Sequence, residues 1–437
     1  MIDETPATLT TMMTPNRRRV TKGLIATGFA SVLFPAVGHA SVVKANTWPV
    51  CGLDLSHAAF RTPADWDRIY AKFWGSLGPQ TKTQIDTVIH NIAGVYDDRD
   101  AEFAWIVHYW IRAWIVMADL TGQSKYMDMC VSFIDYMLDH TDERRIERGE
   151  ITERYVREPL YLKGTGRGGP IWKRGGNGSV LNTGQVVRSI LYFVDAVFEN
   201  PGRWSAYRTE AERYLAAAIL AADAFDNDWQ KFENKGSYHY RSSAGTGDLG
   251  TARTAFNQSA TMVTAHLLIN KWRPDAARAD KVRRLAQYWI DDFAIPQSGG
   301  TLKWRYILNP NIKDVEDAGH AAIDLDFLIP AYLSGVTNLT RSHMTALAQT
   351  FLKRLYTGAS GSNRFVDGTT ESGFSEHYNA GFGWFELGRF APEIVSVTLR
   401  IYNANYPPDA PGGVLWARPM LGWANLLRAA RRCRARS

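Results

Sequence analysis

The distribution of apolar residues predicts helix after helix from Thr62 onward. The segment Thr62–Asp65 places a proline at the first helical position, and apolar residues follow it at helical spacing. Alternation typical of strands is scarce. Further helices are predicted over residues 81–97, 101–120, 125–140, 182–199, 204–228, 257–271, 275–293, 317–334, 340–356, 381–403 and 413–432, and strands only over 237–242 and 301–308.

These helices, about a dozen by the usual spacing rules, are joined by longer loops rich in glycine and aromatic residues. The pattern predicts an all-α fold, an (α/α) toroid or barrel of about six to seven helix pairs with minor β structure in its loops. Short turns are expected at one end of the toroid and functional loops at the other. The sequence shows no residue-level repeat, so the pairing rests on helix spacing.

The first forty residues predict an export signal. Arg17, Arg18, Arg19 and Lys22 precede an apolar run over residues 23–37, and small residues follow it. The basic cluster resembles the twin-arginine signal, and a general secretory signal with a basic start is the alternative. The run is too short to remain as a membrane anchor. Residues 41–437 are therefore expected to form a single (α/α)-barrel catalytic domain, periplasmic or secreted.

Composition narrows the class further. The chain has 437 residues, of which 45% are hydrophobic and 22% charged, which is typical of a globular protein and excludes wholesale disorder. Removing residues 1–40 lowers the formal net charge from +6 to +4. This mild basicity suits an anionic substrate and is too weak to indicate nucleic acid. Cys51, Cys130 and Cys433 have no metal-site spacing and allow one disulfide.

The stretch from Thr301 to Phe327 gathers the residue types that proton transfer needs. Trp304, Arg305 and Tyr306 are an aromatic platform, a cation and a phenol in succession, and His320 follows on the next predicted helix. Such a set indicates proton transfer beside a bound anion. The alternative is a solvated loop followed by an ordinary helix start.

Two loops carry further candidate binding groups. Residues 164–182 contain Trp172 among basic residues and glycines and lead into a helix with Asn182 and Gln185, so a sugar-facing loop is predicted. Residues 236–257 contain Tyr240, Arg241 and Arg253 and lead into a helix that opens with Asn257 and Gln258. Amide donors at a helix start favour a bound negative charge. Exposed loops and simple helix caps are the alternatives.

A third loop, residues 358–379, contains Glu371 and Glu376. A pair of carboxyl groups is what glycoside hydrolysis requires. Solvated acidic residues without a catalytic role are the alternative.

On Asn257-Gln258, Trp304-Arg305-Tyr306 and Glu316–His320, the chain resembles the (α/α)-barrel polysaccharide lyases. Within them it is most similar to the glucuronan and alginate lyases of polysaccharide lyase family 38. The resemblance implies cleavage of a 4-linked uronate polysaccharide by β-elimination, giving 4,5-unsaturated uronate ends without a cofactor or a metal. Related lyases commonly have Asn-His at the helix start, where this chain has Asn257-Gln258.

The resemblance also implies roles for individual residues. Asn257 and Gln258, with Arg305 or Arg241, would neutralise the uronate carboxylate. Tyr306 would remove the C5 proton and protonate the leaving oxygen, with Tyr240 as the second candidate. His320 is an alternative base or an orienting group. Substrate binding is expected from Asn182, Gln185, Trp172, Tyr240, Arg241, Arg253, Trp304 and Glu316, the last of which, with Asp317, either holds Arg305 or caps the helix.

Two other functions remain open from the residues. The first is a glycoside hydrolase on the same toroid, with two carboxyl groups from Asp314, Glu316, Asp317, Glu371 and Glu376. The second is a non-catalytic periplasmic glycan-binding protein. The expected partner is an anionic polysaccharide substrate, with no nucleic acid and no membrane after signal removal, and the oligomeric state stays open.

Overall fold

The computed structural model describes Leu53, Leu55, Ser56, Ala58 and residues 60–74, 103–149, 180–239, 253–308, 315–358, 361–407 and 417–434. Contacts divide the chain into two units, Met1–Val42 and Val43–Ser437, and every described residue belongs to the second. The predicted export signal, the helix over 81–97 and the side chains of Trp172, Tyr240, Arg241 and Asp314 lie outside the described residues. Among the described helices, none combines the length and the apolar character needed to span a bilayer.

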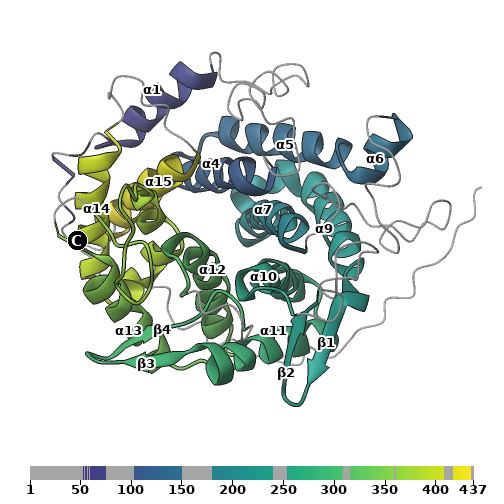
Figure 1. Ribbon diagram of the computed structural model, residues 1–437. Helices are drawn as coiled ribbons and strands as arrows, with labels where there is room; N and C mark the ends of the chain where they lie inside the picture. Colours follow the sequence, from purple (N-terminus) through teal and green to yellow (C-terminus); the bar gives the residue numbers. More distant parts are fainter. Residues whose placement is uncertain are drawn as a thin grey trace, which may run out of the picture. The chain divides into compact units, whose positions relative to one another are not determined.

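An inner ring of helices forms the centre of the Val43–Ser437 unit (Figure 1). Around the ring, α4 packs on α7, α7 on α10, α10 on α12, α12 on η9, and α15 packs back on α4. The short helix η8 (His377–Gly381) lies against both η9 and α15. The ring elements are α4 (His108–Thr121), α7 (Val180–Glu199), α10 (Phe256–Trp272), α12 (Ala318–Ser334), η9 (Gly383–Arg389) and α15 (Ala417–Arg434).

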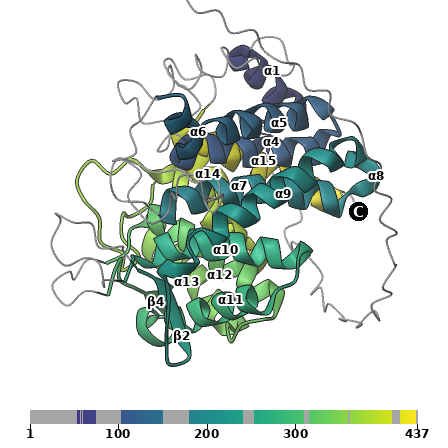
Figure 2. The same ribbon diagram turned by 90° about the vertical axis from the view of Figure 1, so that its right-hand side faces the viewer.

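A second layer of helices covers the ring from outside, as the two views show (Figures 1 and 2). Along the chain, inner and outer helices alternate: α5 packs on α4, α9 on α7 and α11 on α10. This alternation confirms the predicted all-α (α/α) toroid. The outer elements are α1 (Pro63–Trp74), α5 (Ser124–Asp139), α9 (Arg208–Asp223), α11 (Ala276–Tyr288), α13 (Arg341–Thr350) and α14 (Glu393–Asn405).

Short elements complete the described chain. Two antiparallel hairpins, β1 with β2 and β3 with β4, account for the minor β structure predicted in the loops. The bounds are η1 Phe103–Val107, α6 Asp142–Glu147, α8 Pro201–Trp204, η3 Ser205–Tyr207, η4 Asp226–Asp228, β1 Trp229–Phe232, β2 Lys235–Tyr238, η6 Trp289–Phe293, β3 Ile295–Gln297, β4 Thr301–Lys303 and η7 Phe351–Leu355.

The helix predicted over residues 381–403 is wrong in its first half, which forms the 3-10 helix η9 before α14 begins. The cause is close packing on α12, because a Cβ on Gly383 would lie only 2.0 Å from the carbonyl oxygen of Ala322. The indole of Trp384 then donates to the carbonyl oxygen of Ala318 at 2.9 Å. Tertiary packing therefore overrides the helical pattern here.

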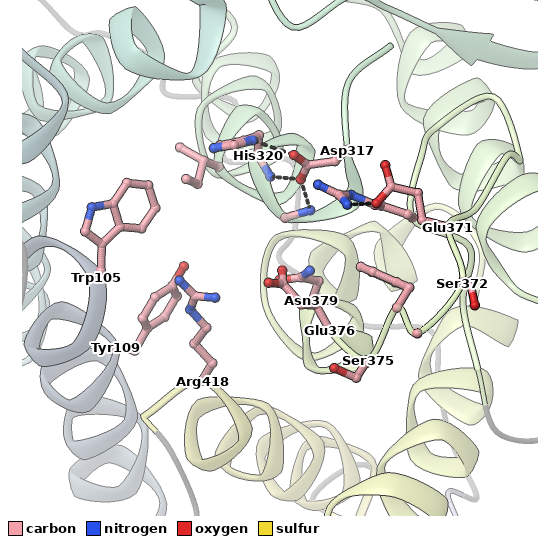
Figure 3. A pocket seen from close by; sticks show the side chains of 15 residues that line it. Trp105, Tyr109, Asp317, His320, Glu371, Ser372, Ser375, Glu376, Asn379 and Arg418 are labelled. Carbon is pink, nitrogen blue, oxygen red and sulfur yellow. Dashed lines mark hydrogen bonds and ion pairs between the residues drawn. The ribbon is translucent and has the colours of Figure 1, made fainter. Parts of the chain in front are cut away.

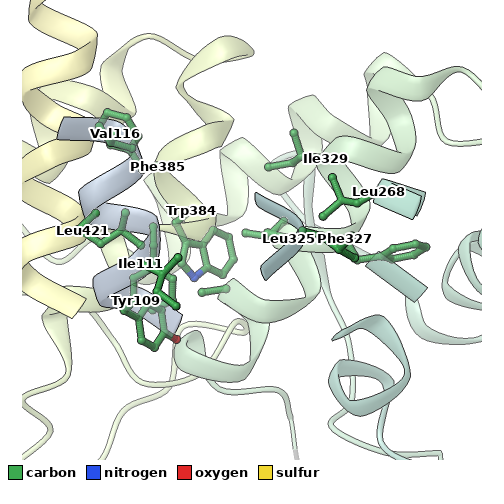
Figure 4. Packing of buried hydrophobic residues seen from close by; sticks show 14 of the residues in the cluster. Tyr109, Ile111, Val116, Leu268, Leu325, Phe327, Ile329, Trp384, Phe385 and Leu421 are labelled. Carbon is green, nitrogen blue, oxygen red and sulfur yellow. The ribbon is translucent and has the colours of Figure 1, made fainter. Parts of the chain in front are cut away.

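The hydrophobic core fills the space between the inner helices. Figure 4 shows Leu325 on α12, Trp384 on η9 and Leu421 on α15 within it. Each fully buried side chain of this size contributes about 1.5–3 kcal/mol of transfer free energy. Most of the described tryptophans belong to this core rather than to a sugar-binding surface.

A buried ion cluster joins three inner helices. Asp326 of α12 accepts two hydrogen bonds from Arg112 of α4, at 2.6 and 3.0 Å, and lies 3.2 Å from Arg188 of α7. Arg188 also donates to Gln185, one turn before it on α7. Asp326 and both arginines are largely or wholly removed from solvent. Burial works to lower the pKa of Arg112, but Asp326 outweighs it and the pKa lies above its ordinary value.

Candidate functional site

A pocket of about 420 Å³ opens where η1, α12 and α15 begin (Figure 3). The loop between η7 and η8 forms its remaining wall among the described residues. The lining residues are Trp105, Tyr109, Asp317, Gly319, His320, Ile323, Arg364, Glu371, Ser372, Gly373, Phe374, Ser375, Glu376, Asn379 and Arg418. The N-terminal ends of α12 and α15 therefore meet η1 around one polar cavity.

Asp317 is the N-cap of α12, one of the two roles predicted for it. Its Oδ1 accepts the backbone N–H groups of Gly319 at 2.8 Å and His320 at 2.9 Å. These bonds satisfy donors that the first helical turn leaves free. Because the cap fixes the side chain, the Asp317 carboxylate has a defined position at the pocket wall.

The same carboxylate orients His320. Asp317 Oδ2 lies 2.6 Å from His320 Nδ1, and the His320 ring packs 5.1 Å from the ring of Tyr306, centroid to centroid. Burial works to raise the pKa of Asp317, but hydrogen bonding and the charge of His320, with the backbone bonds, outweigh it and the pKa lies below its ordinary value. Asp317 is therefore an ionised carboxylate at neutral pH.

The loop between η7 and η8, which carries Glu371 and Glu376, is hydrogen-bonded to the start of α12. Ala318 donates its N–H to the Arg364 carbonyl at 2.7 Å, and Val366 donates to the Glu316 carbonyl at 3.0 Å. A bridge between Asp317 and Phe365 adds to this attachment. The loop residues Glu371 and Glu376 therefore reach the pocket, as a hydrolase site requires.

Gly319 marks the point where two carboxyl groups converge. The place that a Cβ would occupy on Gly319 is 3.2 Å from Asp317 Oδ1 and 3.5 Å from Glu376 Oε2. The two oxygens are therefore at most about 6.7 Å apart, the sum of those distances. Retaining glycosidases separate their carboxyl groups by about 5–5.5 Å and inverting ones by about 6.5–9.5 Å.

Asn379 presents an unused amide to the pocket. Its side chain is buried, and both its Oδ1 and Nδ2 lack a hydrogen-bond partner within the part of the chain that the structure describes. Its Nδ2 lies 3.2 Å from the same point beside Gly319. A buried amide without a partner is costly, so this group is set to bind a polar ligand atom.

The opposite wall is aromatic and cationic (Figure 3). Trp105 of η1 and Tyr109 of α4 are four residues apart and both line the pocket. Arg418, the second residue of α15, donates from Nη1 to the Tyr378 hydroxyl at 2.6 Å. Its guanidinium lies 5.2 Å from the Tyr109 ring centroid and 5.0 Å from that of Tyr378.

Beneath Asp317 lies a pair of buried acids, and one of them, Glu316, has its Oε1 3.8 Å from His320 Nδ1. Glu316 is fully buried, and so is Asp324, which accepts a 2.8 Å hydrogen bond from the indole of Trp304. Burial and the charge of Asp324 raise the pKa of Glu316 well above its ordinary value. Burial likewise raises the pKa of Asp324. Glu316 supports the pocket wall and does not line it.

One set of residues offers ligand atoms for a metal ion in the described ranges. Glu316, Asp317 and His320 each bring one atom to within 4.8 Å of the others. Asp317 Oδ1 already accepts two backbone N–H groups, and Oδ2 contacts His320 directly. Helix capping and the His320 contact therefore use both Asp317 oxygens, whereas the buried Glu316 Oε2 has no hydrogen-bond partner among the described residues.

Of the predicted catalytic residues, His320 lines the pocket and Tyr306 packs beside it. Arg305 pairs through its backbone with Val315 and is exposed. Asn257 is fully buried at the start of α10, next to Gln258, and neither lines the pocket. The structure thus places His320 and Tyr306 side by side. Asn257, Gln258 and Arg305 are not among the residues that line the described pocket.

The predicted binding residues are spread more widely. Asn182 and Gln185 lie within α7 and are buried, so Asn182 is not the N-cap considered for it. Arg253 lies over the ring of Phe232, 3.8 Å from its centroid. Trp304 packs in the core with Trp289 and Trp384 and does not form a platform in the pocket.

Sequence reasoning missed the aromatic and cationic wall. Trp105 and Tyr109 belong to the helix predicted over residues 101–120, and their four-residue spacing was the available signal. Arg418 and Asn379 carry no local motif. Their role depends on which helix ends the toroid brings together.

No family model matches the chain, and no curated protein matches it in sequence. The chain is similar in structure to two inactive variants of alpha-1,6-mannanase GH76A of Salegentibacter sp. HEL1_6, in complex with alpha-1,6-mannotriose and alpha-1,6-mannotetrose. Each has a TM-score of 0.50 and 11% identity, and covers 84% of this chain and 98% of its own. At 11% sequence identity, this structural similarity establishes the fold alone.

These structures correct the resemblance to polysaccharide lyases. The shared (α/α) toroid is the predicted one, but the neighbours with that fold are mannanases, which are glycoside hydrolases. The lyase activity, the glucuronan and alginate substrates and the β-elimination chemistry are therefore wrong as the main interpretation. The toroid pattern misled because unrelated chemistries share one fold.

Proposed function

We propose that this protein hydrolyses glycosidic bonds of a polysaccharide in the pocket at the start of η1, α12 and α15. The observation that carries the proposal is the convergence of Asp317 and Glu376 beside Gly319, within about 6.7 Å of each other. The oligosaccharide complexes of the structurally similar mannanase support a glycan as ligand. Fold likeness alone would not select this activity.

The two carboxyl groups have different environments, as hydrolysis requires. Asp317 is held ionised by His320 and the helix N-terminus, so it serves as nucleophile or base. Glu376 lines the pocket and is exposed, and we assign it as the group that protonates the leaving oxygen. The limit on their separation admits the spacing of retaining enzymes and only the short end of the inverting range.

Other lining residues are suited to hold a sugar ring. The indole of Trp105 offers a flat apolar face, and the unpartnered amide of Asn379 offers a donor and an acceptor to hydroxyl groups. Asn379 lies beside both carboxyl groups, so a hydroxyl bound there places the adjacent glycosidic bond near Asp317.

The inactive mannanase variants favour a second pair of residues as the catalytic acid and base. Both carry replacements at two adjacent aspartates. This sequence has two such pairs, Asp97-Asp98 and Asp291-Asp292. Asp292 forms an ion pair with Lys235 at 2.8 Å and neither residue of its pair lines the pocket.

Asp97-Asp98 lies outside the described residues but ends five residues before Phe103, where η1 begins. Because Trp105 of η1 lines the pocket, this pair is the alternative source of the acid and the base.

The test is hydrolysis of a panel of neutral and acidic polysaccharides that includes an alpha-1,6-linked mannan. We expect new reducing ends without the ultraviolet absorbance of an unsaturated uronate. Glu376→Gln or Asp317→Asn should lower kcat by about 10²- to 10⁴-fold, since each removes a proton-transfer or nucleophilic group.

Matched variants separate the two assignments. Asp97→Asn/Asp98→Asn tests the alternative, and Asp291→Asn/Asp292→Asn is its control with the same chemistry away from the pocket. Loss of kcat in the first pair with Glu376→Gln active would move the catalytic role to Asp97 and Asp98. A panel that yields no reducing ends at all would refute hydrolysis and leave the glycan-binding interpretation.

We also propose that the protein acts outside the cytoplasm, on the grounds of the predicted signal over residues 1–40. Replacement of Arg17, Arg18 and Arg19 by lysine should retain the precursor inside the cell if a twin-arginine signal directs it. Unchanged export of that variant would indicate the general secretory route.

A further inference from the structure

The pocket contains a cation without an acidic partner. Within the described residues, Arg364 pairs with Glu371 and His320 pairs with Asp317, but Arg418 forms no ion pair with a carboxylate. Its hydrogen-bond partner is the neutral hydroxyl of Tyr378. A largely enclosed guanidinium normally binds a carboxylate, a phosphate or a similar group, because its donors and its charge are costly to leave unmatched.

The packing around Arg418 holds it in place without neutralising it. The ring of the buried Tyr109 and the ring of Tyr378 both lie within 5.2 Å of the guanidinium carbon. Aromatic faces attract a cation and restrict its movement, yet they use few of its five N–H donors. The remaining donors face the open centre of the pocket (Figure 3).

We propose that Arg418 is the specificity-determining residue for an anionic group on the sugar, so that the substrate is an acidic glycan bearing a carboxylate, sulfate or phosphate. This inference rests on the proposed function, because it assigns the substrate class of the same pocket. Glu376 is the acidic residue whose charge acts on Arg418.

The geometry also explains why the anion would not bind elsewhere in the described lining. Arg364 forms an ion pair with Glu371, and His320 Nδ1 contacts the carboxylate of Asp317. An anionic sugar that bound near Asp317 would meet a like charge. Arg418 lies on the opposite wall beside Tyr109, where no carboxylate of the described lining is in ion-pair contact with it.

The test compares acidic sugars with their neutral parents by calorimetric titration of the whole exported protein. The probes are glucuronate and glucose 6-sulfate against glucose, and mannose 6-phosphate against mannose. In at least one pair we expect the acidic sugar to bind about 10- to 100-fold more tightly, as for a hydrogen bond to a charged group. The pair that shows the preference identifies the anionic group. Equal affinity within all three pairs overturns the inference.

Variants separate recognition from structure. Arg418→Gln should abolish the preference for the acidic sugar while leaving the affinity for the neutral parent within about twofold, and Arg418→Lys should restore part of it because Lys keeps the charge but not the planar fork. Tyr378→Phe should reduce the preference less than Arg418→Gln does, since it removes only one orienting bond. Arg208→Gln, an exposed arginine paired with Glu212 on α9, is the matched control.

A loss of affinity in Arg418→Gln that is the same for acidic and neutral sugars would show a structural role and overturn the inference. With a substrate that turns over, recognition predicts a raised KM and little change in kcat. The two proposals fail differently. A preference for acidic sugars without new reducing ends would support Arg418 as the anion site and refute hydrolysis. New reducing ends without a preference for acidic sugars would support hydrolysis and refute the role of Arg418.

Discussion

Asp324 and Asp326 lie two residues apart on α12, and both are buried, with 0% and 5% of their surface exposed. Asp326 accepts two hydrogen bonds from Arg112 and forms an ion pair with Arg188 across the ring. Asp324 faces Glu316 and the indole of Trp304, and it forms no ion pair with a cation among the described residues. One helix therefore carries two buried acids with opposite surroundings.

The difference shows that the partner, and not burial itself, decides what a buried acid does. Asp326 connects α4, α7 and α12 through its contacts with two arginines, so its loss would leave two guanidinium groups unmatched. Asp324 and Glu316 are stabilised in the protonated form by burial and form the support beneath the pocket. Asp317, at the start of the same helix, is ionised and faces the cavity. The acids of this region therefore change from ionised at the pocket to neutral beneath it.

The largest expected effect is from Asp326→Asn. It should lower the free energy of unfolding by about 3–5 kcal/mol, because one partner of a buried ion cluster is removed while the arginines stay. Urea unfolding measures it. Asp223→Asn is the matched control, since Asp223 pairs with Arg278 near the surface and should lose at most about 1 kcal/mol. Equal losses in both variants would contradict the importance of the buried cluster.

Replacing the whole cluster should cost much less than breaking it. In Arg112→Met/Arg188→Met/Asp326→Leu no charge is left unmatched, so stability should be equal to that of the wild type or higher by about 1–4 kcal/mol. The same urea experiment measures it. A triple variant as unstable as Asp326→Asn would show that the cluster is required for packing of the ring itself.

The pair beneath the pocket should appear in the pH dependence of stability. Because the pKa of Glu316 and of Asp324 is raised on folding, their contribution is complete below the ordinary carboxyl range and is lost as the pH rises through the raised values. Glu316→Gln/Asp324→Asn does not titrate, so its deficit relative to the wild type should shrink as the pH rises from 4 to 8. A deficit that grows over this range would indicate that the pair is ionised in the folded protein.

The smallest effect is expected at the helix cap. Asp317→Ala should cost about 1 kcal/mol at neutral pH, whereas Asp317→Asn, which still accepts the capping bonds, should cost less. Because the pKa of Asp317 is lowered, the ionic part of its contribution is present above the ordinary carboxyl range and is lost as the pH falls through the lowered value. Thermal unfolding at pH 7 and pH 3 measures both. Equal unfolding temperatures for the wild type and Asp317→Ala at pH 7 would contradict the cap.

The sequence predicted the pocket in part. The start of α12 was recognisable because Asp317 precedes an apolar helix and His320 follows within one turn, which is local information. Glu376 was one of several loop acids with nothing to distinguish it until hydrogen bonds to the start of α12 placed its loop. Trp105, Tyr109 and Arg418 belong to helices at opposite ends of the described chain, and no local pattern relates them.

What the sequence alone determined is the succession of helices and hence the toroid, because apolar spacing along a helix is read from neighbouring residues. What only the tertiary structure decided is the role of each acidic and basic side chain. Asp324 and Asp326 are both aspartates of one helix, and Arg112 and Arg418 are both arginines of helices. Neither the residue type nor the neighbouring sequence distinguishes the members of each pair. Whether such a group is matched, neutral or left to bind a ligand depends on the side chains that distant helices bring to it, since charge interactions act through space at a few ångströms and not along the chain.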